Sequence, residues 1–139
     1  MVGKTSLFCF RQTMDAEFYV EILKKHIPEA NRMLGDRWRF QQDNDPKHTS
    51  RLAQEFLKDH VPEVIEWPSN SPDLNPIENL WSIVKDRVEK RMPKNLDDLE
   101  RFMAEEWNNI PTTVLNNLIK SMKHRCDLVI ELGGERISY

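Results

Sequence analysis

The sequence predicts an α/β domain whose helices gather at the C-terminal end. Three short segments have the apolar runs or alternation of strands: residues 5–11, 37–42 and 63–67. Helical apolar spacing separates these segments and continues alone after a proline-rich stretch at residues 68–76. The chain has 139 residues, of which 39% are hydrophobic and 31% charged, enough for one compact domain with its own core.

The first predicted strand, residues 5–11, is a short apolar run between polar neighbours. A helix is predicted after it, because apolar residues recur at helical spacing from Asp15 onward. Gly35 is expected to end this helix, since glycine adopts the left-handed conformation of a helix terminus. Pro28 falls inside it and is predicted to break or restart the helix, because proline removes a backbone donor.

The second predicted strand, residues 37–42, alternates apolar and polar residues. Asp45 and Pro46 follow it as an N-cap and a proline at the first helical position, so a second helix is predicted from there. The third predicted strand, residues 63–67, comes after this helix and leads into the proline-rich loop.

Three further helices are predicted beyond the loop. The first covers residues 76–91, and Pro93 stops it. Asn95 is the expected N-cap of the next helix. Pro111 opens the last helix, which ends at Gly133.

Composition excludes several classes of protein. No apolar run approaches the roughly 20 residues that span a bilayer, and the N-terminal residues have no signal-peptide core, so neither a membrane partner nor secretion is predicted. The net charge of −3 neither supports nor excludes contact with nucleic acid. Cys9 and Cys126 are far apart in apolar surroundings, which predicts buried free thiols in a reducing compartment. Histidines and cysteines lack zinc-ligand spacing, so no structural zinc site is predicted.

Two carboxylates occupy positions where a ligand site is expected. Asp43 directly follows the segment 37–42, and the carboxyl ends of strands face the ligand crevice in open α/β sheets. Glu78 lies in the first turn of the helix 76–91, on a rigid element whose dipole favours a negative charge. Taken singly, each has a plainer explanation, Asp43 as a turn residue and Glu78 as a partner of the helix dipole.

Two longer motifs contain these carboxylates. Residues 41–49 are QQDNDPKHT, and residues 67–81 are WPSNSPDLNPIENLW. With 34 residues between Asp43 and Glu78, the two motifs closely resemble the mariner superfamily of DNA transposases, in its glutamate-bearing branch. That branch uses the same spacing between its second and third catalytic carboxylates. The resemblance covers nearly the whole chain.

The resemblance implies a ribonuclease-H-like fold in which three carboxylates hold two divalent cations, Mg²⁺ or Mn²⁺. Asp43 and Glu78 would be two of the three, with Asn44 and His48 in support. His48 is expected to orient the Asp43 loop by hydrogen bonding rather than to bind metal. Two such cations roughly 4 Å apart activate a nucleophile and stabilise the leaving oxygen of a phosphodiester. The implied activity is DNA cleavage and strand transfer, with transposon ends and target DNA as partners. The implied location is the nucleus or, more broadly, the cell interior from cytoplasm to nucleus.

The sequence departs from the family pattern upstream of Asp43. The family's first catalytic aspartate lies on its first strand, whereas the acidic residues before Asp43 all fall in or beside the helix that ends at Gly35. The chain is therefore predicted to be a single partial catalytic domain, residues 1–139, that lacks the first two strands and the N-terminal helix-turn-helix modules. Without the first aspartate it is expected to be inactive alone. The segment 5–11 then pairs elsewhere, remains loose or is completed by another chain.

The alternative function is a non-enzymatic remnant that keeps the fold as a DNA- or protein-binding module. Because family transposases act as assemblies on paired ends, a homo-oligomer is also plausible. Lys85, seven residues after Glu78 and on the same helical face, either contacts a DNA phosphate or is a solvated charge that pairs with Glu89. Three basic residues of the last helix are predicted to form a solvated face: Lys120, Lys123 and Arg125.

Overall fold

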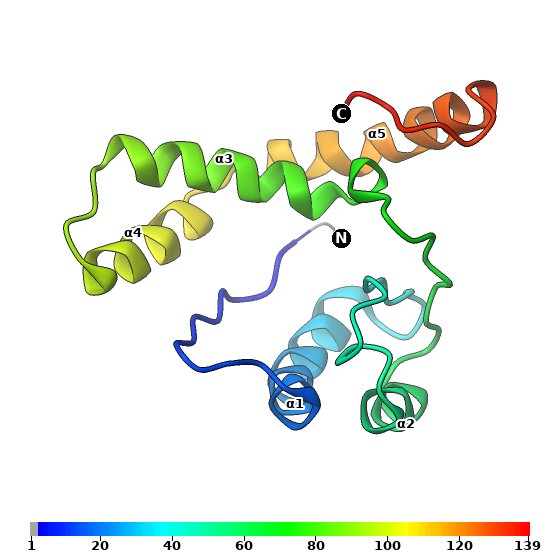
Figure 1. Cartoon of the computed structure of the whole chain (residues 1–139), viewed down its shortest axis with the longest axis horizontal. Coiled ribbons are helices and arrows are strands. Elements are labelled where there is room, and N and C mark those ends of the chain that lie inside the picture. Colours follow the sequence, from blue (N-terminus) through cyan, green and yellow to red (C-terminus); the bar gives the residue numbers. More distant parts are fainter. Residues whose placement is uncertain (1–2) are drawn as a thin grey trace. The chain divides into compact units, whose positions relative to one another are not determined.

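The computed structural model describes residues 3–139, and the chain divides into two compact units, one ending at Ser69 and the other comprising Asn70–Tyr139 (Figure 1). The first unit contains α1 (Ala16–Leu34) and α2 (Arg51–His60). The second contains the short 3₁₀ helix η1 (Pro72–Leu74), α3 (Pro76–Lys90), α4 (Leu96–Asn108) and α5 (Thr112–Glu131). Among the described helices, none is both long and apolar enough to cross a membrane.

Helix α1 begins and ends where the sequence predicts. The Asp15 carboxylate accepts a hydrogen bond of 2.8 Å from the backbone N of Phe18 and caps the helix. Gly35 ends it with a φ of 72°, in the left-handed region. The predicted break at Pro28 is wrong, because α1 continues through this residue. Proline removes only one intrahelical hydrogen bond here, and the buried contacts of α1 hold the helix together on both sides of it.

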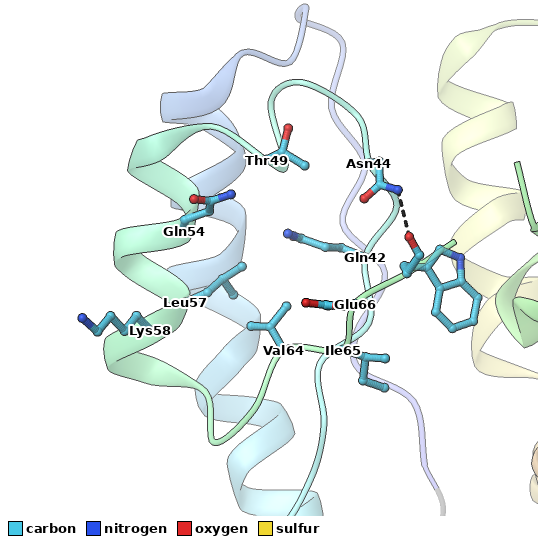
Figure 2. A pocket seen from close by; sticks show the side chains of 10 residues that line it. Gln42, Asn44, Thr49, Gln54, Leu57, Lys58, Val64, Ile65 and Glu66 are labelled. Atoms are coloured by element: carbon cyan, nitrogen blue, oxygen red, sulfur yellow. Dashed lines mark hydrogen bonds between the residues drawn. The ribbon is translucent and has the colours of Figure 1, made fainter. Parts of the chain in front are cut away.

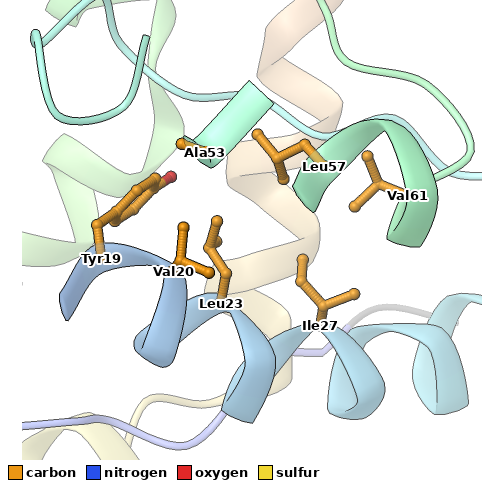
Figure 3. Close-up of a cluster of buried hydrophobic side chains, with 7 residues drawn as sticks. All are labelled: Tyr19, Val20, Leu23, Ile27, Ala53, Leu57 and Val61. Atoms are coloured by element: carbon orange, nitrogen blue, oxygen red, sulfur yellow. The ribbon is translucent and has the colours of Figure 1, made fainter. Parts of the chain in front are cut away.

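The core of the first unit lies between α1 and α2 (Figure 3). Each helix contributes a stripe of apolar side chains at helical spacing, and burying one such side chain stabilises the fold by about 1.5–3 kcal/mol. The buried residues are Tyr19, Val20, Leu23, Ile27, Ala53, Leu57 and Val61. These buried contacts hold α1 against α2. The segment between the two helices carries Asp43, so the core fixes where both ends of that segment lie.

Helix α2 begins later than predicted. Its N-cap is Ser50, whose Oγ accepts a hydrogen bond of 3.2 Å from the backbone N of Ala53. Asp45 instead closes a turn over the residues that follow it, because its carbonyl accepts hydrogen bonds from the backbone N atoms of His48 and Thr49. The aspartate–proline pair thus marks a turn before the helix rather than the helix start.

The predicted strands are not formed as strands by the described residues. Segments 37–42 and 63–67 do meet, at a single parallel bridge between Phe40 and Val64. There the N of Phe40 donates to the O of Glu63, and the N of Ile65 donates to the O of Phe40, both at 2.8 Å. Parallel pairs are stable mainly inside larger sheets, so two short segments do not sustain a ladder. Within residues 3–139 the expected α/β layering is reduced to this one bridge.

The segment 5–11 runs along α1 instead of joining a strand. The backbone N and the Oγ of Ser6 each donate a hydrogen bond of 3.0 Å to the Glu29 carboxylate. Desolvation raises the pKa of Glu29, but the hydrogen bonds from Ser6 outweigh it and leave the pKa below its usual value. Phe10 packs edge-on against Phe18, with ring centroids 5.3 Å apart. Within the described residues, the segment therefore contacts side chains of α1 and forms no ladder with another strand.

The predicted C-terminal helices are confirmed as α3, α4 and α5. Asn95 caps α4 as expected, since its Oδ1 accepts a hydrogen bond of 2.8 Å from the backbone N of Asp98. Trp107 of α4 is buried and stacks on Trp81 of α3, with centroids 5.1 Å apart. Apolar residues of all three helices therefore form the core of the second unit.

The two cysteines form no disulfide within residues 3–139, and both are exposed, whereas the sequence predicted buried thiols. Cys9 lies in the extended segment beside α1, where no sheet face covers it in the described structure. Cys126 follows Arg125, and it is Arg125 that points into the interior of the second unit. Apolar neighbours along the chain did not predict burial here, because burial depends on which helical face is covered.

Candidate functional site

Asp43 stands in a loop that is fixed by its own hydrogen bonds. Its Oδ1 accepts from the backbone N of Asp45 at 3.2 Å and lies 2.5 Å from Nδ1 of His48. The Asp43 side chain is 65% exposed, and no described residue donates a hydrogen bond to its Oδ2. One oxygen therefore orients the carboxylate, and the other has no protein partner among residues 3–139. The expected contact between His48 and Asp43 is present.

Tyr19 and Gln42 contact His48 and fix its position. The Tyr19 ring lies against the His48 ring, with centroids 4.2 Å apart, and its hydroxyl donates a hydrogen bond of 2.7 Å to Oε1 of Gln42. Nε2 of Gln42 in turn donates to the carbonyl of His48 at 3.1 Å. Burial, and secondarily the charge of Asp43, raise the pKa of Tyr19, so the phenol remains a neutral donor. Sequence reasoning missed both residues, since Tyr19 has the pattern of an ordinary core position.

Asn44 links the Asp43 loop to the start of the second motif. Its Nδ2 donates to the carbonyl of Trp67 at 2.9 Å and to the Oγ of Ser69 at 3.2 Å. A pocket of about 460 Å³ opens beside this link, between α2 and the segments around Gln42 and Val64 (Figure 2). The pocket has polar and apolar walls, and Asn44 lines it. Asp43 is not among the lining residues, so the pocket and the carboxylate are neighbouring features.

Glu78 is exposed in the first turn of α3, and no described residue forms a hydrogen bond or ion pair with its carboxylate. The turn is well defined, because Oδ1 of Asn75 caps it at Ile77 N (3.4 Å) and Pro76 occupies its first position. Lys85 is exposed on the same helix. Its ammonium forms no ion pair with Glu89 or with any other described residue, so the expected alternative of a pair with Glu89 is not realised.

Two other aspartates near the motifs are already engaged. The Lys47 ammonium lies 2.6 Å from Asp45, and its hydrogen bond, with a second from the Lys47 amide, holds the pKa of Asp45 below its usual value. Asp73 is buried, and its Oδ2 accepts a hydrogen bond of 2.8 Å from the backbone N of Ile137. Within residues 3–139, no group of three or more histidine, cysteine, aspartate or glutamate side chains is arranged to hold a metal ion.

Arg125 overturns the prediction of a solvated basic face on the last helix. It is only 1% exposed, whereas Lys123 is exposed and pairs with Asp127 at 3.0 Å. Residues two positions apart on a helix point about 200° away from each other, so a cluster in sequence is not a cluster in space. The arginine contacts the loop before α3, which sequence reasoning did not indicate.

The structure groups Asp43, Asn44 and His48 in the first unit, and it carries Glu78 and Lys85 in the second. The donor chemistry fits Mg²⁺ or Mn²⁺, because Asp43 and Glu78 both offer carboxylate oxygens that no described residue occupies. Two carboxylates provide only part of the ligand set that a pair of such ions requires.

Comparisons with known proteins agree on one family. A model described as DDE superfamily endonuclease matches residues 2–100. The transposable element Tcb1 transposase of Caenorhabditis briggsae is 40% identical over 128 residues, which are 91% of this chain and 47% of Tcb1. The chain thus spans about half the length of the curated relatives it matches.

Two solved structures share the architecture of the chain. The Mos1 transposase catalytic domain with Raltegravir and Mg matches with a TM-score of 0.82 at 19% identity, over 91% of this chain and 67% of that one. The Mos1 mariner paired end complex with Mn matches with a TM-score of 0.76 at 19% identity, over 91% of this chain and 39% of that one. At these identities the likeness is one of fold.

Proposed function

We propose that this chain, which belongs to the DDE superfamily endonuclease family as part of a mariner-type transposase catalytic domain, supplies two of the carboxylates that hold metal ions for DNA cleavage and strand transfer. The observation that carries the proposal is the Asp43 loop. One carboxylate oxygen is fixed by His48 and by the Asp45 amide, and the other has no partner among the described residues. Glu78, exposed on a rigid first helical turn, is the second proposed ligand.

Asp43 and Glu78 would hold Mg²⁺ or Mn²⁺, ions that polarise the phosphoryl group and stabilise the leaving oxygen. The solved Mos1 structures named with Mg and with Mn support this choice of ion. His48 keeps the Asp43 carboxylate in one orientation, which lowers the entropy lost when an ion binds. Tyr19 packs against the His48 ring, and Gln42 donates a hydrogen bond to the His48 carbonyl, so both keep His48 in place.

DNA is the proposed substrate, and Lys85 is proposed to contact a phosphate. Two observations support this role: Lys85 is exposed without an ion pair among the described residues, and seven positions after Glu78 it lies on the same side of α3. Such a contact positions DNA without reading its sequence. We also propose that the protein acts in the nucleus as a homo-oligomer. Its proposed partners are paired DNA ends, a choice that the name of the Mos1 paired end complex supports.

We further propose that the two units form one partial catalytic domain of the ribonuclease-H-like α/β class. The first two strands and the first aspartate of that fold would come from residues outside 1–139. Support comes from coverage, because the chain matches 47% of the Tcb1 transposase and 67% of the Mos1 catalytic-domain chain. The single bridge at Phe40 is then the remnant of a sheet that further strands would extend.

Calorimetric titration of the chain with Mn²⁺ tests the metal site. We expect weak binding, with a dissociation constant on the order of 10⁻⁴–10⁻³ M, because two carboxylates offer limited charge and few ligands. The double variant Asp43→Asn, Glu78→Gln should abolish the binding heat. A matched control is Glu89→Gln, an exposed glutamate of the same helix α3. Binding that survives the double variant would show that other residues hold the ion.

A further inference from the structure

Arg125 of α5 is a buried cation whose hydrogen bonds all go to neutral oxygens. Its Nη1 donates to the carbonyl of Asp73 and its Nη2 to Oδ1 of Asn79, both at 2.8 Å. Its Nε donates to the Oγ of Ser121 at 3.0 Å. Burying a guanidinium is costly unless its donors are satisfied. An arginine that is only 1% exposed therefore needs hydrogen-bond acceptors arranged around it. Three separate segments, η1, α3 and α5, provide them.

The C-terminal tail, residues 135–139, completes this environment. The backbone N of Ile137 donates a hydrogen bond of 2.8 Å to Oδ2 of Asp73, and the Ile137 side chain is buried. The Tyr139 ring lies 4.2 Å from the guanidinium carbon of Arg125, in cation–π contact. Asp73 therefore accepts a hydrogen bond from the tail with its carboxylate and one from Arg125 with its backbone carbonyl. We call Arg125, Asp73 and residues 135–139 the tail clamp.

The tail clamp reaches the first turn of α3 through Asn79, the residue after Glu78. Successive residues on a helix are rotated by 100°, so fixing the direction of Asn79 also fixes the direction of Glu78. Asn75 caps the same turn, and its backbone N donates to the carbonyl of Pro72 in η1 at 3.0 Å. The Asp73 carbonyl held by Arg125 lies in η1 as well. The tail clamp thus contacts η1 at Asp73 and the first turn of α3 at Asn79.

We propose that the tail clamp positions Glu78 for metal binding, with Arg125 and Asp73 as positioning residues. The inference rests on the proposed function of Glu78 as a ligand. It gives the C-terminal residues, which carry no carboxylate of the metal site, a share in its geometry. Arginine suits this role because its planar fork bonds to several oxygens at once, which a lysine cannot do.

The test compares Arg125→Met with Lys123→Met, an exposed position of the same helix, in the full chain. Two readouts are followed by NMR: amide hydrogen exchange at residues 76–80, and broadening of the Glu78 amide signal by Mn²⁺. In Arg125→Met we expect exchange at residues 76–80 to rise roughly tenfold, as for the loss of one or two hydrogen bonds, and broadening at Glu78 to fall several-fold. Lys123→Met should change neither. Unchanged exchange and broadening in a folded Arg125→Met protein would overturn the proposal.

A second variant covers the case in which Arg125→Met does not fold. Truncation after Gly134 removes the tail and leaves every helix intact, and the same changes at residues 76–80 and at Glu78 are expected, in smaller degree. A truncated chain that matches the native one in both readouts would contradict the clamp. If Mn²⁺ broadens no signal near Glu78 even in the native chain, the proposed metal site fails. The exchange rates then still decide whether the clamp orders the first turn of α3.

Discussion

At the scale of single residues, the Asp43 carboxylate is held by a series of contacts that begins at Tyr19 in the core. The Tyr19 ring supports His48, its hydroxyl holds Gln42, and Gln42 binds the His48 carbonyl. His48 then contacts the carboxylate. A buried phenol thus ties the orientation of an exposed acidic group to the packing of α1 against α2.

Replacing Tyr19 with phenylalanine removes the hydroxyl and keeps the ring, so it distinguishes the contribution of the hydrogen bond from that of the ring contact. The variant keeps the packing on His48 but loses the hydrogen bond to Gln42, so the free energy of unfolding at neutral pH should fall by about 1 kcal/mol. Because the folded-state pKa of Tyr19 is raised above its ordinary 10.0, its contribution is present below that pH and is lost as pH rises above it, where the unfolded chain deprotonates first. Urea unfolding should therefore show a smaller alkaline loss of stability in Tyr19→Phe than in the native chain.

The control for this prediction is Tyr139→Phe. The Tyr139 ring contacts Arg125, but its hydroxyl makes no hydrogen bond with a described residue. The Tyr139→Phe variant should therefore have a free energy of unfolding close to that of the native chain, both at neutral pH and as the pH rises. The same alkaline loss in Tyr19→Phe and in the native chain would show that the Tyr19 hydroxyl does not carry the effect.

At the scale of elements, the helix ends follow from local capping, whereas the predicted strands did not form within residues 3–139. Asp15, Ser50, Asn75 and Asn95 each accept a hydrogen bond from a backbone N two or three residues ahead. These interactions need no distant partner, so most helix ends could be predicted from sequence. A strand needs a neighbour, and the segment 5–11 found side chains of α1 instead.

Replacing Pro28 with alanine tests how much α1 tolerates its internal proline. The change restores one backbone donor in mid-helix, so the free energy of unfolding should rise by roughly 1–3 kcal/mol, less the entropy that proline removes from the unfolded chain. Arg32→Ala, in the exposed last turn of α1, is the control and should change stability little. A fall in stability on thermal or urea unfolding would mean that Pro28 shapes α1 for its contacts with the segment 5–11.

At the scale of the whole molecule, the proposed metal site would take one carboxylate from each unit, because Asp43 belongs to one and Glu78 to the other. A shared ion requires the two carboxylates within a few ångströms of each other, since Mg²⁺ binds oxygen at about 2.1 Å. In NMR titrations with Mn²⁺, Glu78→Gln should therefore weaken signal broadening around Asp43, and Asp43→Asn should weaken it around Glu78. Variants that each affect only their own surroundings would mean two independent sites.

The 139-residue chain alone should show no DNA nicking or strand transfer above background. Without the first aspartate, two carboxylates cannot stabilise the attacking and leaving oxygens together. The neighbouring acids do not replace it, because Lys47 occupies Asp45 and the tail occupies Asp73. The measurement is nicking of labelled duplex in Mn²⁺, with Glu78→Gln beside it. Nicking by the native chain that disappears in Glu78→Gln would reveal a substitute carboxylate.

The sequence by itself determined the family, most of the helix ends and the identity of the two candidate ligands. Motif spacing and caps are properties of neighbouring residues, so they can be recognised along the chain. Only the tertiary structure decided that Tyr19 and Gln42 support His48, that Arg125 is buried rather than solvated, and that Asp73 holds the tail. Arg125 and Asn79 are 46 residues apart, and Ile137 and Asp73 are 64 apart. Hydrogen bonds across such separations form only when packing has brought the segments together, which no local pattern encodes.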